Sequence, residues 1–282
     1  MKLSIVLSTQ PASFSALAYK GHWEENIGKI KILGYDGVEL AVRDPKLLDV
    51  SSLKLVLTEQ RLIVPAIGTG QAFGEEGLSF THAEAETRRK AIERVKSHIE
   101  LASDFGAIVI IGLVRGKRGA GVDPDQAEQW LIEALRECAL NNKAVKLAIE
   151  PINRYETDLI NTVVSGLNLV ERIQMENIGL LLDTFHMNIE EPSLTTSIAS
   201  SKDRLFHFHI ADSNRWYPGA GHTNFRPIVD VLDQIGYPGF LSAEILPFPD
   251  PDTAARKTIE YMRTLVQHSS NTVTYSAPGL QR

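Results

Sequence analysis

The segment Lys146-Leu-Ala-Ile-Glu-Pro-Ile-Asn-Arg-Tyr-Glu156 decides the fold, because it has the form of a short buried strand that ends in a carboxylate. Side chains alternate across a strand, so Leu147 and Ile149 share one face while Ala148 and Glu150 share the other. An ionised Glu150 in this position needs a metal, a cation or hydrogen bonds, because burial otherwise raises its pKa until the carboxyl is neutral. The rest of the chain has to supply that compensation.

Three later segments repeat the pattern of a short apolar strand with a polar side chain at its end. These polar residues are Asp183, His209 and Glu244. His207, two positions before His209, points to the same side of its strand, and the neighbouring phenylalanines point to the other side. Together with Glu150, the three strand ends predict an oxygen-rich site for a divalent cation, in which Glu150, Asp183, His209 and Glu244 are the ligands.

Length and composition restrict the class of protein. A chain of 282 residues, 43% of them hydrophobic, is long enough for one large core. A formal net charge of -6 and the lack of a basic run argue against nucleic acid or a membrane surface, so the expected partner is a small molecule. The single cysteine, Cys138, excludes an internal disulfide framework and fits the cytoplasm, which is the expected location. The apolar N-terminal stretch is too short for a signal peptide, and we expect no membrane-spanning segment.

Short strand patterns alternate with longer helical patterns along the chain. Besides the four segments above, we expect strands at 2–7, 37–42, 62–67 and 108–114. The expected helices are 24–33, 45–60, 83–105, 125–140, 163–175, 194–200, 228–235 and 252–268.

Eight strand-then-helix units predict a closed (β/α)8 TIM barrel, an α/β fold in which one domain spans residues 1–268. An open doubly wound sheet is disfavoured because no glycine-rich phosphate loop follows the first strand. In a TIM barrel the active site lies at the carboxyl ends of the strands, where all four expected ligands fall. Residues 269–282 are polar and lack periodicity, so a tail and a contact in a homo-oligomer both stay open.

The sequence resembles the xylose-isomerase-like TIM barrels, and within them the ketose 3-epimerases of the D-tagatose and D-psicose type. The resemblance covers nearly the whole chain and is most specific at 150–156, 183–188 and 209–215, with 218–222. It implies that Glu150, Asp183, His209 and Glu244 bind a divalent metal, commonly manganese. It further implies that Glu156, His186 and Arg215 surround the substrate.

A closer likeness within this family is to the 5-keto-L-gluconate epimerases of inositol catabolism, through residues 41–45, 68–72, 184–191 and 211–216. The tagatose-type enzymes usually carry Gly-Glu-Ala-Asn-Arg where this chain has Ala211-Asp-Ser-Asn-Arg215. Because of this departure, a neutral ketose and a keto-sugar acid both stay open as the substrate.

The expected chemistry follows from the residue types. Inversion of a carbon next to a ketone removes a proton from one face and returns one to the other, through an enediolate whose charge must be stabilised. Glu150 and Glu244 suit the acid and base roles, which contribute roughly 10² to 10⁴-fold in rate. His186 and Arg215 would hydrogen-bond the substrate oxygens and the enediolate, and Glu156 would orient the nearby histidine or a substrate hydroxyl. Oxygen ligands with one imidazole favour Mn²⁺, with Mg²⁺ or Co²⁺ as alternatives, over a structural zinc ion.

Two arginines extend the expected site. Arg43 and Arg115 follow the second and fourth expected strands, which places them on the rim of the active site. A guanidinium pairs well with the carboxylate of an acidic sugar. The alternative for each is a solvated loop charge.

Three other functions remain open. The first is a 1,2-aldose/ketose isomerase, which uses a similar site. The second is a nuclease of the endonuclease IV type, which needs a histidine-rich trinuclear zinc cluster and is disfavoured by the negative net charge. The third is a non-catalytic sugar-binding barrel, which has little need for two carboxylates that converge on one metal. The fold alone does not separate these.

Overall fold

The computed structural model describes residues 1–119 and 121–269, and their strands form a closed parallel barrel. The barrel closes because the first and last of its strands, β1 and β9, pair with each other. A short additional strand, β2 (Tyr19–Lys20), pairs with the end of β1. In order around the barrel the strands are β1 (Lys2–Ser8), β3 (Gly37–Ala41), β4 (Ala66–Gly68), β5 (Ile108–Ile111), β6 (Leu147–Ile149), β7 (Ile178–Asp183), β8 (Leu205–Ile210) and β9 (Phe240–Ala243).

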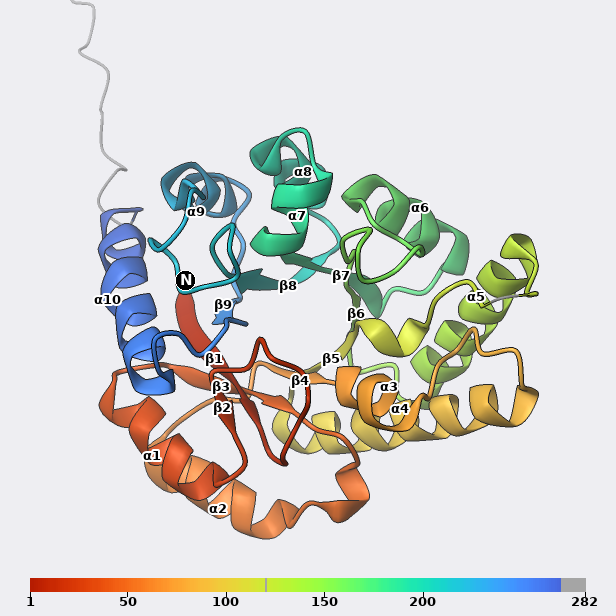
Figure 1. The fold of residues 1–282 in the computed structure, drawn as a ribbon, viewed down its shortest axis with the longest axis horizontal. Coiled ribbons are helices and arrows are strands. Elements are labelled where there is room, and N and C mark those ends of the chain that lie inside the picture. Colours follow the sequence, from red (N-terminus) through yellow and green to blue (C-terminus); the bar gives the residue numbers. More distant parts are fainter. Residues whose placement is uncertain (120, 270–282) are drawn as a thin grey trace, which may run out of the picture.

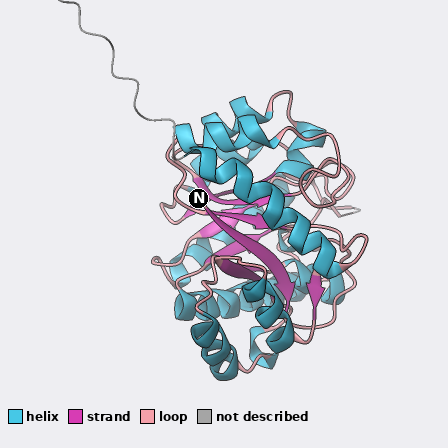
Figure 2. Cartoon of the chain, turned by 90° about the vertical axis from the view of Figure 1, so that its left-hand side faces the viewer, coloured by secondary structure: helices cyan, strands magenta, loops and turns pink. Residues whose placement is uncertain are grey.

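Helices surround the barrel on its outside, as Figures 1 and 2 show. This arrangement confirms the predicted (β/α)8 TIM barrel. The helices are α1 (Trp23–Ile32), α2 (Val50–Gln60), α3 (Gly70–Glu76), α4 (Ala85–Phe105), α5 (Pro124–Asn141), α6 (Val163–Ile173), α7 (Thr184–Glu190), α8 (Leu194–Ser200), α9 (Phe225–Gln234) and α10 (Pro251–Ser269), with the 3₁₀ helices η1 (Pro45–Leu47) and η2 (Leu113–Arg115).

Local sequence sets where several helices begin and end. The side chain of Asp123 accepts hydrogen bonds from the backbone N–H groups of the first turn of α5, which satisfies donors that a helix start leaves free. Thr162 and Ser165 form a reciprocal capping box at the start of α6. Gly106, with φ of +64°, ends α4 in the left-handed conformation that glycine adopts without strain.

Three expected elements differ from the structure. The helix expected at 45–60 is divided into η1 and α2, because the Asp49 side chain accepts a hydrogen bond from Ser52 N and starts a new helix. The strand expected at 108–114 stops at Ile111, since the chain turns at Gly112 into η2. The strand expected at 62–67 is regular only in β4, and Ile63 makes an isolated bridge. The short helices α3 and α7 were not predicted.

The alternation of side chains along the strands divides the core. Most buried apolar residues lie between the strands and the helices in one continuous cluster. A smaller cluster of Ala66, Ile110, Ala148 and Leu181 is buried on the inner side of the strands. This inner cluster fills the interior of the barrel with apolar side chains. A polar site is therefore expected at the carboxyl ends of the strands, where the filled interior ends.

The predicted C-terminal tail lies outside the described residues from position 270 onward, and Ser269 is the last residue of α10. Within the described ranges, no helix combines the length and the apolar character that crossing a membrane requires.

Candidate active site

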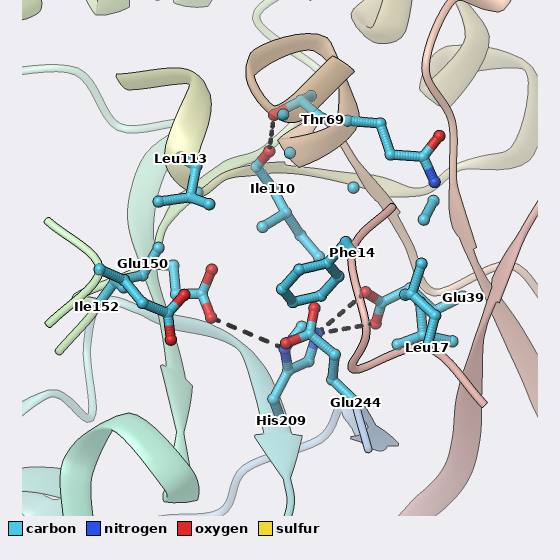
Figure 3. Close-up of a pocket in the computed structure, with 18 of the residues that line it drawn as sticks. Phe14, Leu17, Glu39, Thr69, Ile110, Leu113, Glu150, Ile152, His209 and Glu244 are labelled. Atoms are coloured by element: carbon cyan, nitrogen blue, oxygen red, sulfur yellow. Dashed lines mark hydrogen bonds and ion pairs between the residues drawn. The ribbon is translucent and has the colours of Figure 1, made fainter. Parts of the chain in front are cut away.

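Four polar side chains converge at the carboxyl ends of neighbouring strands. Glu150 directly follows β6, Asp183 ends β7, His209 lies in β8 and Glu244 directly follows β9. One ligand atom of each residue lies within 4.8 Å of those of the other three. Figure 3 shows Glu150, His209 and Glu244 directed into the same space. The structure thus brings together the four residues that the strand pattern singled out.

Unpartnered atoms show that this cluster fits a cation. Glu150 Oε1, Asp183 Oδ2 and His209 Nδ1 are buried and have no hydrogen-bond partner. His209 Nδ1 lies 3.7 Å from Asp183 Oδ2 and 3.9 Å from Glu150 Oε1. Buried polar atoms are normally hydrogen-bonded, so three unpartnered polar atoms in one place indicate that a ligand completes the site. Three carboxylates and one imidazole form a suitable donor set for a divalent cation.

The protein environment shifts the pKa of each acidic residue in the cluster. Burial, and then the charge of Glu244, raise the pKa of Glu150 well above its usual value. Burial also raises the pKa of Glu244, although Arg215 opposes the shift. Burial would raise the pKa of Asp183 as well, but His186 and His209 hold it below its usual range. A bound cation would favour the deprotonated form of all three carboxyls.

Arg215 joins two of the acidic residues at the mouth of the barrel. Its guanidinium donates to Glu156 Oε1 at 3.0 Å and to Glu244 Oε2 at 2.8 Å. The same group lies 5.1 Å from the ring centre of Phe14 and 4.8 Å from that of Phe185, in contacts of the cation–π type. These contacts fix the guanidinium beside the cluster, where it is held next to any ligand in the cavity.

His186 also faces the cluster and has a defined tautomer. The Asn153 side-chain amide donates to Nδ1 of His186 at 2.7 Å, so the ring proton is on Nε2. His186 Nε2 lies 3.6 Å from Glu150 Oε1. Burial lowers the pKa of His186 to about 4, so the imidazole is neutral at pH 7 and keeps one N–H for hydrogen bonding.

Three residues of the cluster, Glu150, His209 and Glu244, line a cavity together with apolar side chains. Phe14 and Leu17, from the segment after β1, cover one side, as Figure 3 shows. The predicted residues that line this cavity are Glu150, Glu156, His186, His209, Arg215 and Glu244.

The structure corrects the expected position of the two arginines. Arg115 is completely buried and does not lie on the rim. Its guanidinium donates to the carbonyl oxygens of Gly112 at 3.0 Å, of Leu159 at 3.0 Å and of Ile160 at 3.3 Å. The reason is the early end of β5 at Ile111, after which Arg115 lies in η2 and not in an exposed loop. Arg43 does not line the cavity either, and its Nε lies 3.8 Å from a carboxylate oxygen of α3.

One residue of the site was missed from the sequence. Glu39 lies in β3 and is 2% exposed. Its carboxylate accepts hydrogen bonds from Nε2 of His207 at 2.7 Å and of His209 at 3.0 Å. The sequence feature that could have indicated Glu39 is its place as the single charged residue in the otherwise apolar strand 37–41.

The fold and the site together define a TIM barrel with a carboxylate–histidine cluster at the carboxyl ends of its strands. The model of the Xylose isomerase-like TIM barrel family matches residues 27–265. The chain therefore belongs to this family.

Relatives with named activities support this membership. The chain is 29% identical to an L-ribulose 3-epimerase of Methylomonas sp. (strain DH-1), over 91% of each chain. It is 27% identical to a 3-dehydro-D-guloside 4-epimerase of Escherichia coli (strain K12), over 85% of this chain and 94% of the relative.

Among solved structures, the D-allulose 3-epimerase of Methylomonas sp. in complex with D-allulose is similar with a TM-score of 0.79. It is 26% identical and covers 94% of this chain and 97% of its own. The named relatives are epimerases, which are isomerase-class enzymes that act on sugars, and the predicted resemblance to ketose 3-epimerases is confirmed.

Proposed function

We propose that this protein is a metal-dependent epimerase that inverts the carbon next to the ketone of a keto-sugar or keto-sugar acid. The observation that carries the proposal is the convergence of Glu150, Asp183, His209 and Glu244 with three unpartnered ligand atoms. The epimerase activities of the relatives support the same class of reaction.

The four residues would hold a divalent cation, with Mn²⁺ as the first choice and Mg²⁺ or Co²⁺ as alternatives. When bound, such an ion supplies Lewis-acid polarisation of the substrate carbonyl, which is worth several kcal/mol of charge stabilisation.

Glu150 and Glu244 are the proposed acid/base pair. They come from the ends of different strands, and Figure 3 shows them reaching the same space from different directions. One carboxylate takes the proton from one face of the carbon next to the ketone, which leaves an enediolate. The other carboxyl then delivers a proton to the opposite face of that carbon. Two groups are needed because one carboxylate cannot reach both faces without a reorientation of the substrate.

The remaining polar groups bind and orient the substrate. Arg215 holds Glu244 by a 2.8 Å hydrogen bond and places positive charge beside the developing enediolate. The free Nε2–H of His186 is available to a substrate oxygen. Glu156 fixes the other side of Arg215 and also accepts a hydrogen bond from Asn153, which contacts His186.

The substrate is proposed to be a ketose inverted at C3 or an acid such as 5-keto-L-gluconate, as in inositol catabolism. Exchange with solvent tests both. Mn²⁺-loaded protein is incubated in D₂O with a panel of ketoses and keto-sugar acids, and the products are analysed by NMR and mass spectrometry. Deuterium at the inverted carbon is the expected result.

The same experiment separates two of the other functions, the isomerase and the sugar-binding barrel. An aldose product that carries deuterium at C2 would identify a 1,2-aldose/ketose isomerase instead. Exchange in no sugar of the panel, in the presence of bound Mn²⁺, would contradict the epimerase proposal and favour a non-catalytic sugar-binding barrel.

A further inference from the structure

A second group of buried titratable side chains lies beside the proposed metal site. Glu39, His207 and His209 bring ligand atoms within 4.8 Å of one another. We propose that Glu39 is a positioning residue, which accepts the Nε2–H protons of both histidines and thereby directs the Nδ1 lone pair of His209 at the cation. This inference rests on the metal site of the proposed function.

The hydrogen-bond geometry defines the role of Glu39. Its Oε2 lies 2.7 Å from His207 Nε2, and its two oxygens lie 3.0 and 3.1 Å from His209 Nε2. An ionised carboxylate only accepts hydrogen bonds, so both imidazoles must donate at Nε2. Glu39 comes from β3, whereas both histidines come from β8, so this contact crosses the interior of the barrel.

The donated proton determines which nitrogen of His209 can bind a metal. A neutral imidazole carries one proton, so donation at Nε2 leaves the lone pair on Nδ1. Nδ1 is the buried atom without a partner that faces Asp183 and Glu150. A metal-bound histidine commonly donates its second ring N–H to a carboxylate, which fixes both the tautomer and the ring orientation. Glu39 occupies this position for His209.

The same geometry argues against a second cation between Glu39 and the histidines. Such an ion would require the Nε2 lone pairs of both rings. A neutral His209 cannot offer lone pairs at both of its nitrogens, so occupation of the four-ligand site excludes occupation of this one. The 2.7 Å contact from His207 is an ordinary charge-assisted hydrogen bond. We therefore expect one cation per chain.

His207 has a supporting role in this arrangement. It lies two residues before His209 on the same face of β8, and the two rings meet edge to face with centres 5.4 Å apart. Its hydrogen bond is the shortest one to Glu39 and restrains the carboxylate that also accepts from His209.

The variant Glu39→Gln tests the proposal with a minimal change of shape. A glutamine amide replaces one of the two carboxylate oxygens by an NH₂ donor, which would then face a donating Nε2–H of His209 or of both histidines. Either His209 loses its acceptor or its proton moves to Nδ1, and both outcomes weaken the ligand. The expected result is a loss of about 10- to 100-fold in Mn²⁺ affinity, measured by calorimetric titration.

His98→Gln is the control, because it also replaces a fully buried, hydrogen-bonded titratable side chain by glutamine. The ring nitrogens of His98 lie 2.7 Å from Arg94 O and 2.8 Å from Val42 O, and the ring N–H donates to one of these carbonyls. His98 contacts none of the four ligands, so this variant should keep the Mn²⁺ affinity of the wild type. Circular dichroism in chelator verifies that each variant is folded.

A second measurement does not depend on the folding of any variant. Wild-type protein labelled with ¹⁵N-histidine and loaded with diamagnetic Mg²⁺ should show the ring proton of His209 on Nε2 in long-range ¹H–¹⁵N spectra. A proton on Nδ1, two Mn²⁺ ions per chain, or a Glu39→Gln variant that binds Mn²⁺ as tightly as the control would each overturn the proposal. Wild-type protein that binds no Mn²⁺ would instead remove the proposed metal site itself.

Discussion

Replacing Glu150 by Gln should have opposite effects on stability with and without a metal. Burial and the charge of Glu244 raise the pKa of Glu150 in the folded protein. A carboxyl with a raised pKa holds its proton more tightly when folded, so it lowers folding stability as the pH rises above its ordinary value of about 4.3. The glutamine amide does not ionise, so it does not lower the folding stability in this way. At pH 7 in chelator, the midpoint of thermal unfolding of Glu150→Gln should equal or exceed that of the wild type.

The added metal should reverse this order. An ion at 100 times its Kd stabilises the folded state by about 2.7 kcal/mol. An unfolding entropy of about 2.1 cal/mol/K per residue, taken over 282 residues, amounts to about 0.6 kcal/mol/K. The ratio predicts that Mn²⁺ raises the midpoint of the wild type by about 4 to 5 °C. Glu150→Gln loses a charged ligand and should show a clearly smaller rise at the same Mn²⁺ concentration.

The assay is thermal unfolding followed by circular dichroism, in chelator and in Mn²⁺, together with deuterium exchange into the substrate. Glu156→Gln is the control, because Glu156 lies in the same cavity but outside the four-ligand cluster. It should keep the full Mn²⁺ shift. The reasoning is refuted if Glu150→Gln gains the same Mn²⁺ shift as the wild type, or keeps normal exchange. A midpoint in chelator well below that of the wild type would refute the charge argument.

Three further predictions concern other parts of the molecule. Arg215→Lys keeps the charge but loses the fork that bonds two carboxylates, so kcat/KM should fall by at least about 10-fold in steady-state kinetics. Gly166→Ala should destabilise the protein by about 1 to 3 kcal/mol in urea unfolding, because the new Cβ would lie 2.9 Å from a methyl carbon of Leu180. Gly28→Ala is its control in a helix with open space, and should be neutral or stabilising by up to about 1 kcal/mol. Burial raises the pKa of the Cys138 thiol to about 12, so a thiol reagent at pH 8 should modify it only after unfolding in guanidinium.

Much of the site could be predicted from the sequence, because the direction of each side chain on a strand depends only on its neighbours in the chain. Alternation along each strand places the last polar residue on the inner side, and parallel strands bring their carboxyl ends to one edge. These two rules were enough to select Glu150, Asp183, His209 and Glu244 as neighbours. Helix limits were also close to those observed where a cap is present, as at Asp123.

Other features depend on contacts between distant segments. Arg115 follows a strand, and its burial became visible only when the loop at Leu159 supplied carbonyl oxygens for its guanidinium. Glu39 looked like one charge in an apolar strand until the closed barrel brought it to His209, 170 residues away in the chain.

The sequence by itself determined the class of fold and the positions of the four clustered residues, because the alternation of side chains and the strand-then-helix order are properties of short segments. Only the tertiary structure decided which charged side chains line the cavity and which of them, like Glu39, hydrogen-bond the histidines of the site. That decision depends on closure of the barrel, which brings distant segments within hydrogen-bonding distance. A buried ionised group is stable only where partners hydrogen-bond or pair with it. No local pattern of residues specifies which distant segments supply these partners.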